Sequence, residues 1–446
     1  MAGDDFRTIA EELAAAIEDG RLRPGDRLPP LRRFARQRRI AASTAHRVYR
    51  ELARRGLTVG EVGRGTFVRT APPPADPALA EPGGHRVDLE LNLPVLPDQP
   101  ALLAAGLGGL LQQGDALTAA LHPAGAAGTP AARRTAAAHL ARAGWAPDPG
   151  RLLFAGSGRQ ALAAAFAALA PPGTRLGVET LTFPVVKGIA ARLGITLVPL
   201  AMDADGIVPG ALRSAGPLRA VYLQPALHNP LGTTMPATRR FELAAELRAL
   251  DLYAVEDAVY GFLRPDLAPL AALAPERTVL VDSLSKRLAP GLTLGFLVPP
   301  EGGAGPAFAA ALRSGGWTAS GFALAAAVRW LADGTATAVE EAKRADAAAR
   351  RRIAADRLAG FRLRADPQSY HCWWELPDPW RADTFVAAAA RRGIAVSPSG
   401  AFTAGPGHAP NAVRLALSAP PADVLAEALD VLAALARRAP EDAGAE

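Results

Sequence analysis

The sequence predicts an α/β protein with a mostly parallel sheet and flanking helices, preceded by a small winged helix-turn-helix domain. Short apolar runs, such as 152–154 and 278–281, are followed by small-residue turns and helical stretches, an order typical of strand–helix units. Alternating apolar residues at 361–376 indicate a smaller C-terminal α+β region. The first 70 residues differ from the others in charge, and a Pro-rich stretch separates the two parts.

The positive charge is concentrated at the N-terminal end. Residues 1–70 hold 15 Arg and 9 Asp plus Glu, a surplus of six that equals the net charge of +6 for the whole chain. Concentrated positive charge on a small domain attracts phosphate backbones and makes binding depend on salt. A solvated surface is the alternative, and charge alone does not decide between them.

The residue pattern of this N-terminal part predicts three helices and a two-stranded wing. Apolar residues at helical spacing indicate the helices, a hydroxyl suits a helix start, and glycines punctuate the end. The predicted elements are a first helix with Ile9, Leu13 and Ile17 on one face, a second helix at 31–38, a turn at 40–42, a third helix at 43–54, and wing strands at 57–59 and 63–68. This order is that of a winged helix-turn-helix.

Proline and small residues at 71–77 and 81–84 predict an extended, semi-rigid spacer. The chain therefore divides into a winged-helix head and a larger body joined by a linker. The predicted boundaries are 1–70 for the head, 71–87 for the linker, 88–435 for the α/β body and 436–446 for a tail that is expected to be disordered.

Lys286 is one of only three lysines in a chain that otherwise uses arginine for its cations. An arginine cannot form an imine, whereas a lysine that loses its proton in a suitable pocket can attack an aldehyde. Lys286 follows the apolar run 278–281, as expected for a residue at the end of a buried strand. It is therefore a candidate Schiff-base residue for pyridoxal phosphate (PLP). Lys187 and Lys343 lie in helical or charged surroundings and are expected to be solvated.

Other side chains suit the ring of such a cofactor. Asp257 ends a strand-like segment and would face the pyridine nitrogen, which keeps the ring protonated and able to accept electrons. Tyr260 and Asn229 offer a phenol and an amide to the 3-oxygen of the ring. Phe183 would stack on the ring, although a core Phe is the usual explanation. A plain turn is the alternative for the Asn-Pro-Leu-Gly segment that contains Asn229.

The phosphate of the cofactor would require backbone amides at a helix start. Ser157, Gly158 and Arg159 lie in a small-residue turn between a short strand and an Ala-rich helix, and are the predicted cradle. The hydroxyls of Ser283 and Ser285 are further candidates for phosphate binding. A glycine-bearing turn alone is weak support, because most such turns bind nothing.

Taken together, residues from about 88 to 435 resemble a fold-type I PLP-dependent aminotransferase, with the motifs of the family in their usual order. The resemblance implies a homodimer, and it implies that Arg414, with Asn229, binds a substrate α-carboxylate. The chain departs from the family at Thr293, where an arginine usually neutralises the cofactor phosphate. Arg159 or Arg287 is then expected to supply that charge, or PLP is held more weakly.

The head resembles the GntR-type DNA-binding domain, through Pro-Gly-Asp-Arg-Leu-Pro at 24–29 and Gly-Arg-Gly-Thr-Phe-Val at 63–68. The resemblance places the third helix in the major groove of double-stranded DNA. The implied contact residues are Ser43, Thr44, His46 and Arg47 on that helix, with Arg32, Arg64 and Thr66 on the backbone and the wing. Ala41 and Ala42 stand where the family often has Ser-Arg. The whole arrangement is similar to the MocR subfamily of bacterial regulators.

The composition limits the location and the chemistry. No stretch has the roughly 20 apolar residues that a membrane helix requires, so no membrane partner is expected. Residues 1–20 are acidic without a basic start, unlike a signal peptide, and a single cysteine argues for the cytoplasm. The seven histidines show no metal-ligand spacing, so no metal is expected.

Three functional hypotheses follow. The first is a cytoplasmic transcription regulator whose body senses PLP, or an amine or amino acid bound with it, and shifts DNA affinity. The second is an active PLP-dependent aminotransferase acting on an amino acid and a 2-oxo acid, in which Lys286, Asp257 and Tyr260 are catalytic. The third is a body that acts only as a dimerisation scaffold.

Overall fold

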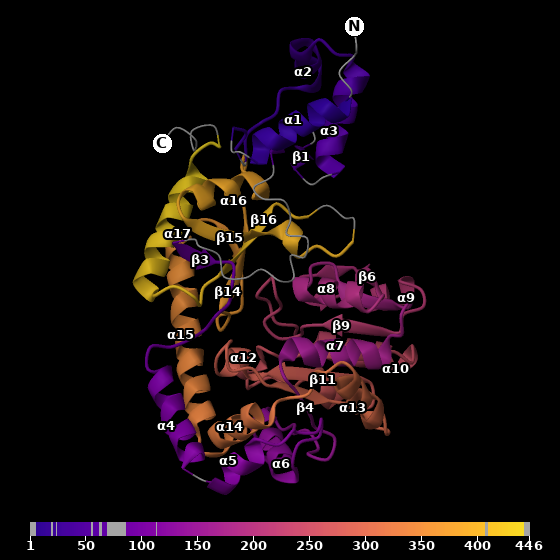
Figure 1. The fold of residues 1–446 in the computed structure, drawn as a ribbon, viewed down its shortest axis with the longest axis vertical. Coiled ribbons are helices and arrows are strands. Elements are labelled where there is room, and N and C mark those ends of the chain that lie inside the picture. Colours follow the sequence, from indigo (N-terminus) through magenta and orange to yellow (C-terminus); the bar gives the residue numbers. More distant parts are fainter. Residues whose placement is uncertain are drawn as a thin grey trace.

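The computed structural model describes residues 6–18, 21–23, 25–54, 57–61, 65–68, 86–112, 114–405 and 409–440. Most of the predicted linker, Arg64 and residues 441–446 of the predicted tail lie outside the described residues. The described part forms a head, a large domain built on a seven-stranded sheet and a small domain built on a five-stranded sheet (Figure 1). The predicted fold class is confirmed.

The head contains the three helices and the wing that the sequence predicts. They are α1 (Phe6–Glu18), α2 (Leu31–Arg38), α3 (Ala42–Arg54), β1 (Thr58–Glu61) and β2 (Gly65–Val68). The left-handed Arg39, at φ 53°, ends α2 and allows the tight turn into α3. Ile9, Val48 and Leu52 form part of the core that holds the three helices together, whereas Ile17 is only partly buried.

The large domain has a mixed sheet in the strand order β4-β12-β11-β10-β9-β5-β6. Its strands are β4 (Leu153–Ala155), β5 (Arg175–Glu179), β6 (Thr196–Leu200), β9 (Ala220–Leu223), β10 (Tyr253–Asp257), β11 (Thr278–Ser283) and β12 (Gly295–Val298). Five neighbouring strands are parallel, and β12 runs antiparallel to both β11 and β4. The central strands are buried on both faces, as their continuous apolar sequences predict.

Helices cover the faces of this sheet. The helices of the large domain are α4 (Gln99–Leu111), α5 (Gly114–Ala120), α6 (Pro130–Leu140), α7 (Gly158–Leu169), α8 (Pro184–Arg192), α9 (Pro209–Ser214), α10 (Ala237–Ala249), α11 (Leu270–Leu273), α12 (Leu284–Arg287), α13 (Gly305–Ser314) and α14 (Gly321–Ala332). Short elements complete it: β7 (Met202–Asp203), β8 (Gly206–Ile207) and the 3-10 turn η2 (Gly261–Leu263). The Ala-rich helix α7 packs closely on the sheet, with a run of buried residues from 161 to 166.

The small domain has a sheet in the order β13-β14-β16-β15-β3, antiparallel except for the last pair. Its elements are β3 (Val87–Leu89), β13 (Arg362–Arg364), β14 (His371–Glu375), α16 (Ala382–Arg391), β15 (Ile394–Pro398), the 3-10 turn η3 (Ser399–Ala401), β16 (Ala412–Ala416) and α17 (Ala422–Arg437). The sole cysteine of the chain, Cys372, is fully buried in β14. The edge strand β3 begins at Val87, the last residue of the predicted linker.

Helix α15 (Thr335–Arg357) is the long connection between the two sheets. It begins beside α4 and α14 of the large domain and ends beside α17 of the small domain (Figure 1). Within the described residues, no helix is both long and apolar enough to span a bilayer.

Candidate functional site

Asp257, predicted to face the cofactor ring, and Ser283, predicted to bind its phosphate, lie at one edge of the large sheet. Asp257 is the last residue of β10 and Ser283 the last of β11, and these two strands are parallel neighbours. The carboxyl ends of parallel strands therefore bring these side chains together, in the region where ligands bind in open sheets of this kind.

Asp257 is buried, and its carboxylate is fixed by three donors. Oδ2 accepts a hydrogen bond of 2.9 Å from the Tyr222 phenol and another of 2.9 Å from the Gln224 amide, while Oδ1 accepts from the backbone amide of Val259 at 3.2 Å. Burial nevertheless raises the pKa of Asp257 to about 6, because these donors do not fully replace water. A cation placed opposite this carboxylate would favour its ionised form.

Gln224 connects Asp257 to the residues predicted to bind substrate. Its Oε1 accepts from the backbone amide of Asn229 at 3.2 Å. The Asn229 Oδ1 in turn accepts from Arg414 at 3.2 Å. A hydrogen-bonded chain therefore runs from the large domain, through Gln224 and Asn229, to Arg414 on β16 of the small domain.

Arg414 is buried and highly constrained. One terminal nitrogen donates to Ser397 Oγ at 2.9 Å and to the backbone carbonyl of Glu90, and the guanidinium lies 5.0 Å from the centroid of the Phe402 ring. Its Nε is buried without a hydrogen-bond partner in the structure. Burial lowers the pKa of Arg414, so a carboxylate beside it would compensate a costly buried charge.

Tyr260 is buried at the start of η2, where its phenol oxygen accepts a hydrogen bond of 3.1 Å from Asn92. Burial raises the pKa of Tyr260 to about 12, so the phenol is a proton donor at neutral pH. The same Asn92 amide lies 3.3 Å from Nδ1 of His371, whose ring packs 5.4 Å from Tyr260. Burial lowers the pKa of His371 to about 3, so this imidazole is neutral.

Lys286 projects from the short helix α12 toward the segment that follows β3, where its ammonium donates to the carbonyl of Asn92. Burial lowers the pKa of Lys286 to about 8, and the positive charges of Arg414 and Arg159 act in the same direction. Burial and nearby positive charge are the conditions under which a lysine amine becomes a nucleophile near neutral pH.

The predicted phosphate cradle is formed by two helix starts. Ser157 caps α7 and Ser283 caps α12, and the Ser283 and Ser285 hydroxyl oxygens are 2.6 Å apart. A Cβ on Gly158 would lie only 3.0 Å from Cβ of Ser283, so a larger residue would require Ser283 to shift. Arg159 is exposed at the first turn of α7. The arrangement offers amides, hydroxyls and one arginine to an anion.

Thr293 lies beside this cradle, and its hydroxyl donates to the carbonyl of Gly156 at 2.8 Å. The charge expected from Arg287 is not available there. Arg287 is buried between Asp282 and Glu340, with nitrogen–oxygen distances of 2.7 Å to both. The prediction that Arg287 binds the cofactor phosphate is therefore wrong, because two carboxylates already neutralise its guanidinium. Arg159 remains.

Two other predictions concern residues that flank the site. Phe183 is partly buried at the start of α8 and packs against the core of the large domain. Lys343 was expected to be solvated, and this is wrong because its side chain is fully buried in α15. Lys187 is also not free in solvent: it is partly buried, and its ammonium donates to the carbonyl of Ala401 at 2.5 Å.

Sequence reasoning missed Asn92, Gln224 and His371 as members of the site. Gln224 carries a usable signal, since it immediately follows β9 at the same carboxyl edge as Asp257. Asn92 and His371 carry none, because they reach Tyr260 from sequence separations of 168 and 111 residues through the small domain.

The proposed DNA contacts lie on the outer face of the head. Arg32 on α2 and Ser43, His46 and Arg47 on α3 are exposed, whereas Thr44 and Thr66 are partly buried. Arg50 is also exposed, one or two turns beyond these positions on α3, and sequence reasoning missed it. The Arg47 guanidinium lies 3.9 Å from the centroid of the Phe6 ring, so α1 helps to orient it.

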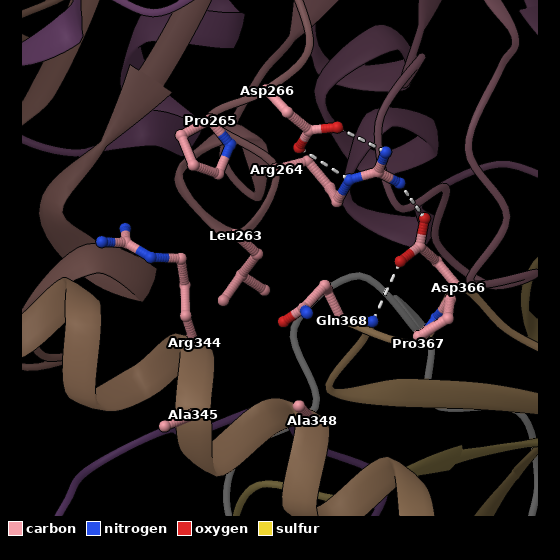
Figure 2. A pocket seen from close by; sticks show the side chains of 10 residues that line it. All are labelled: Leu263, Arg264, Pro265, Asp266, Arg344, Ala345, Ala348, Asp366, Pro367 and Gln368. Carbon is pink, nitrogen blue, oxygen red and sulfur yellow. Dashed lines mark hydrogen bonds and ion pairs between the residues drawn. The ribbon is translucent and has the colours of Figure 1, made fainter.

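A separate pocket of about 630 Å³ lies between the large domain, α15 and the small domain (Figure 2). Arg264 of the large domain forms salt bridges with Asp266 and with Asp366 of the small domain. Asp366 also accepts a 2.7 Å hydrogen bond from Thr234. These interactions join the two domains at a place that none of the predicted site residues lines.

Comparison with known proteins agrees with this geometry. Residues 122–432 match the family model of aminotransferase class I and II, and residues 6–68 match the model of the gntR family of bacterial regulatory proteins. The chain belongs to the aminotransferase class I and II family. It carries a gntR-type head in front of that domain.

One relative matches along nearly the whole chain. The chain is 29% identical to the uncharacterized HTH-type transcriptional regulator YdeF of Bacillus subtilis, over 93% of this chain and 90% of that protein. It is 28% identical to the HTH-type pyridoxine biosynthesis transcriptional regulator PdxR of Corynebacterium glutamicum, over 66% and 65% of the two chains. An archaeal alanine:glyoxylate aminotransferase structure superposes with a TM-score of 0.72 at 22% identity, covering 79% of this chain and 90% of that chain, which supports the fold.

Proposed function

We propose that this protein is a PLP-dependent, DNA-binding transcription regulator, whose aminotransferase-like body binds PLP together with an amine or amino-acid effector. The observation that carries the proposal is the fusion of a gntR-type head to an aminotransferase-type domain. A relative that matches nearly the whole chain, and another that matches 66% of it, bear the names of transcriptional regulators. A regulator of DNA acts where the chromosome is, so we place the protein in the cytoplasm.

The residues at the sheet edge fit the cofactor. The unpartnered Nε of Arg414 and the close approach at Gly158 suit the anionic groups of the ligand. The buried carboxylate of Asp257 suits a protonated ring nitrogen. We assign the phosphate to Ser157, Gly158, Arg159, Ser283 and Ser285, the pyridine nitrogen to Asp257, the 3-oxygen to Tyr260 and Asn229, the ring face to Phe183, the aldehyde to Lys286, and the effector carboxylate to Arg414 and Asn229.

When bound, PLP would supply an aldehyde for covalent capture of an amine and a ring that accepts electrons. The chain's own residues would do the rest. Lys286 offers an amine whose protonated and unprotonated forms are about equally populated near pH 8, and Asp257 holds negative charge opposite the ring nitrogen. Arg414 orients a carboxylate, and because it lies on the small domain, an effector would contact both domains at once.

The second candidate is an active aminotransferase. The observation in its favour is that Lys286, Asp257, Tyr260 and Arg414 all meet at the same site, linked through Gln224, Asn229 and Asn92. The observation against it is Thr293, which leaves the cradle without the usual buried arginine. Turnover of an amino acid with a 2-oxo acid that is abolished by Lys286→Ala would support this candidate.

We further propose a homodimer. Large apolar side chains are exposed on α4 and α14 and beside α5, elements that pack against one another: Leu102, Leu121 and Phe322. Leu292, six residues after Lys286 in a loop, is exposed too. A second copy that covers these side chains would remove apolar surface from water close to the lysine.

The test is a mobility-shift experiment with the full-length protein and its own promoter region at low salt, with and without PLP. We expect a shifted band whose midpoint changes when PLP, or PLP with a candidate amine, is added. Lys286→Ala should keep the shift but lose its response to PLP. No shift under either condition would overturn the regulator. A shift that never responds to PLP or amines would favour the scaffold.

A further inference from the structure

Lys343, the buried lysine of α15, is not among the residues assigned to the cofactor or the effector. Lys343 has no exposed surface, and among the residues that the structure describes it forms no salt bridge. Its ammonium donates instead to two backbone carbonyls, that of Lys286 at 2.9 Å and that of Leu288. Both belong to the segment that carries the predicted cofactor lysine.

The carbonyl of Lys286 belongs to the last turn of α12, and that of Leu288 belongs to the residue that caps its C-terminal end. Helix α12 has only four residues, so its last carbonyl groups cannot all be satisfied within the helix. The carbonyl of Leu288 also accepts a 2.8 Å hydrogen bond from the Gln99 amide on α4. Buried donors from α4 and α15 therefore hold the backbone on the C-terminal side of Lys286.

A lysine suits this position better than an arginine. Elsewhere the chain uses arginine for such links, as at Arg350, which donates to the carbonyls of Leu417 and Pro420. Beside Lys286, however, Arg414 and Arg159 already concentrate positive charge. Burial and the nearby Lys286 lower the pKa of Lys343 to about 7, against the attraction of Glu340 and Asp346, and a neutral amine still donates hydrogen bonds.

The same face of α15 continues to the small domain. The carbonyl of Lys343 and the carboxylate of Asp346 both lie 2.9 Å from the Tyr370 phenol oxygen and share its one proton. Arg350 forms a 2.8 Å salt bridge with Asp346 and donates to the carbonyl of Leu417, the residue after β16. The helix thus links the backbone around Lys286 to the strand that carries Arg414.

We propose that Lys343 is a positioning residue for Lys286: its buried amine holds the carbonyls of residues 286 and 288 and so fixes the backbone from which the cofactor lysine projects. The inference rests on the proposed function, because it concerns the same PLP site. Unlike the proposed function, this inference makes a prediction about the protein in the absence of PLP. The segment from 284 to 292 should be rigid because of one side chain on another helix.

Hydrogen exchange in full-length protein without PLP tests the backbone directly. In Lys343→Met, which is of similar length and cannot donate, we expect the amides of residues 288 and 292 to exchange about tenfold faster, the effect of losing one or two hydrogen bonds. PLP affinity, followed by absorbance, should fall about tenfold too. Lys187→Met is the matched control, since that lysine also donates to carbonyls but far along the sequence from α12.

The outcomes separate positioning from general stability. Faster exchange confined to peptides around 284–292, with an unchanged melting temperature, supports the proposal. Wild-type exchange in this segment, or faster exchange across the whole body, overturns it. Should Lys343→Met fold poorly, Lys343→Gln, which keeps a donor on a shorter side chain, should give an intermediate exchange rate. If wild-type protein binds no PLP, the proposed function fails, but the exchange result still decides the role of Lys343.

Discussion

Charge is distributed unevenly among the residues of the site. Two carboxylates, those of Asp257 and Glu179, accept hydrogen bonds from Gln224, at one end of the chain that runs through Gln224 and Asn229. At the other end Arg414, with Arg159 nearby, gives Lys286 a positive surrounding. Such a site attracts an anionic ligand and favours the neutral amine of its lysine.

The reactivity of Lys286 should therefore change with pH in a range that is unusually low for a lysine. Because burial and positive neighbours lower its pKa from 10.5 to about 8, the unprotonated amine is the main form above pH 8 and is lost below it. We expect the initial rate of borohydride-trapped PLP incorporation to rise with a midpoint near pH 8. Peptide mass mapping should locate the adduct at residue 286.

Two variants control this measurement. Arg159→Ala removes one positive neighbour, so the midpoint should move to higher pH while incorporation also weakens through loss of a phosphate contact. Lys286→Ala should give no adduct at all. A midpoint near 10.5 in the wild-type protein would show that the amine is in contact with bulk water.

Helix α15 carries three of the buried charged side chains of the body. Glu340 bonds with Arg287 and His139, and the same helix carries Lys343 and Arg350. The burial of Lys343 could not be predicted from the sequence, because Glu-Glu-Ala-Lys-Arg is equally typical of an exposed helix and the acceptors lie 55 and 57 residues away. Asp257 and Lys286, in contrast, end apolar strands that the local sequence reveals.

The Glu340 network should stabilise the body in a pH-dependent way. Arg287 and His139 hold the pKa of Glu340 at about 2, below its ordinary value of 4.5. This contribution, about 3 kcal/mol, is present above pH 4.5 and is lost as the pH falls toward 2. In urea unfolding, Glu340→Gln should therefore be less stable than wild type at pH 7, with the difference shrinking below pH 4.5. A constant difference across this range would contradict the assignment.

The exposed face of α3 leads to a prediction about DNA binding. If its exposed face lies along DNA, Arg50→Ala should reduce the slope of log affinity against log salt by about one, the loss of one phosphate contact. Filter binding or anisotropy at several salt concentrations measures the slope. Arg352→Ala, an exposed arginine of α15, should leave it unchanged. Equal effects of the two variants would place DNA somewhere other than α3.

At the scale of the whole molecule, the fold class follows from strand–helix order and from the local charge of the head, whereas the contacts between domains do not. Arg264 with Asp366, and Asn229 with Arg414, join segments more than 100 residues apart. No periodicity in the sequence indicates such pairs. The family motif indicates Arg414, whereas Asp366 has no motif to reveal it.

The proposed dimer should dissociate when charge enters its apolar surface. We expect Leu102→Asp with Leu121→Asp to shift the mass found by light scattering from two chains to one, because burying a carboxylate against apolar side chains is costly. Phe241→Asp, at an exposed apolar residue of α10, is the control and should stay dimeric. A wild-type monomer at micromolar concentration would refute the dimer.

The complete burial of Cys372 makes the chain convenient for spectroscopy. Its thiol is the only one in the sequence and has no exposed surface, and burial raises its pKa to about 12, so it should resist alkylation. A cysteine introduced at an exposed position such as Arg36 on the head, and another at Arg352, would therefore accept maleimide dyes without background. Energy transfer between the two dyes would then report how far the head travels when an effector is added.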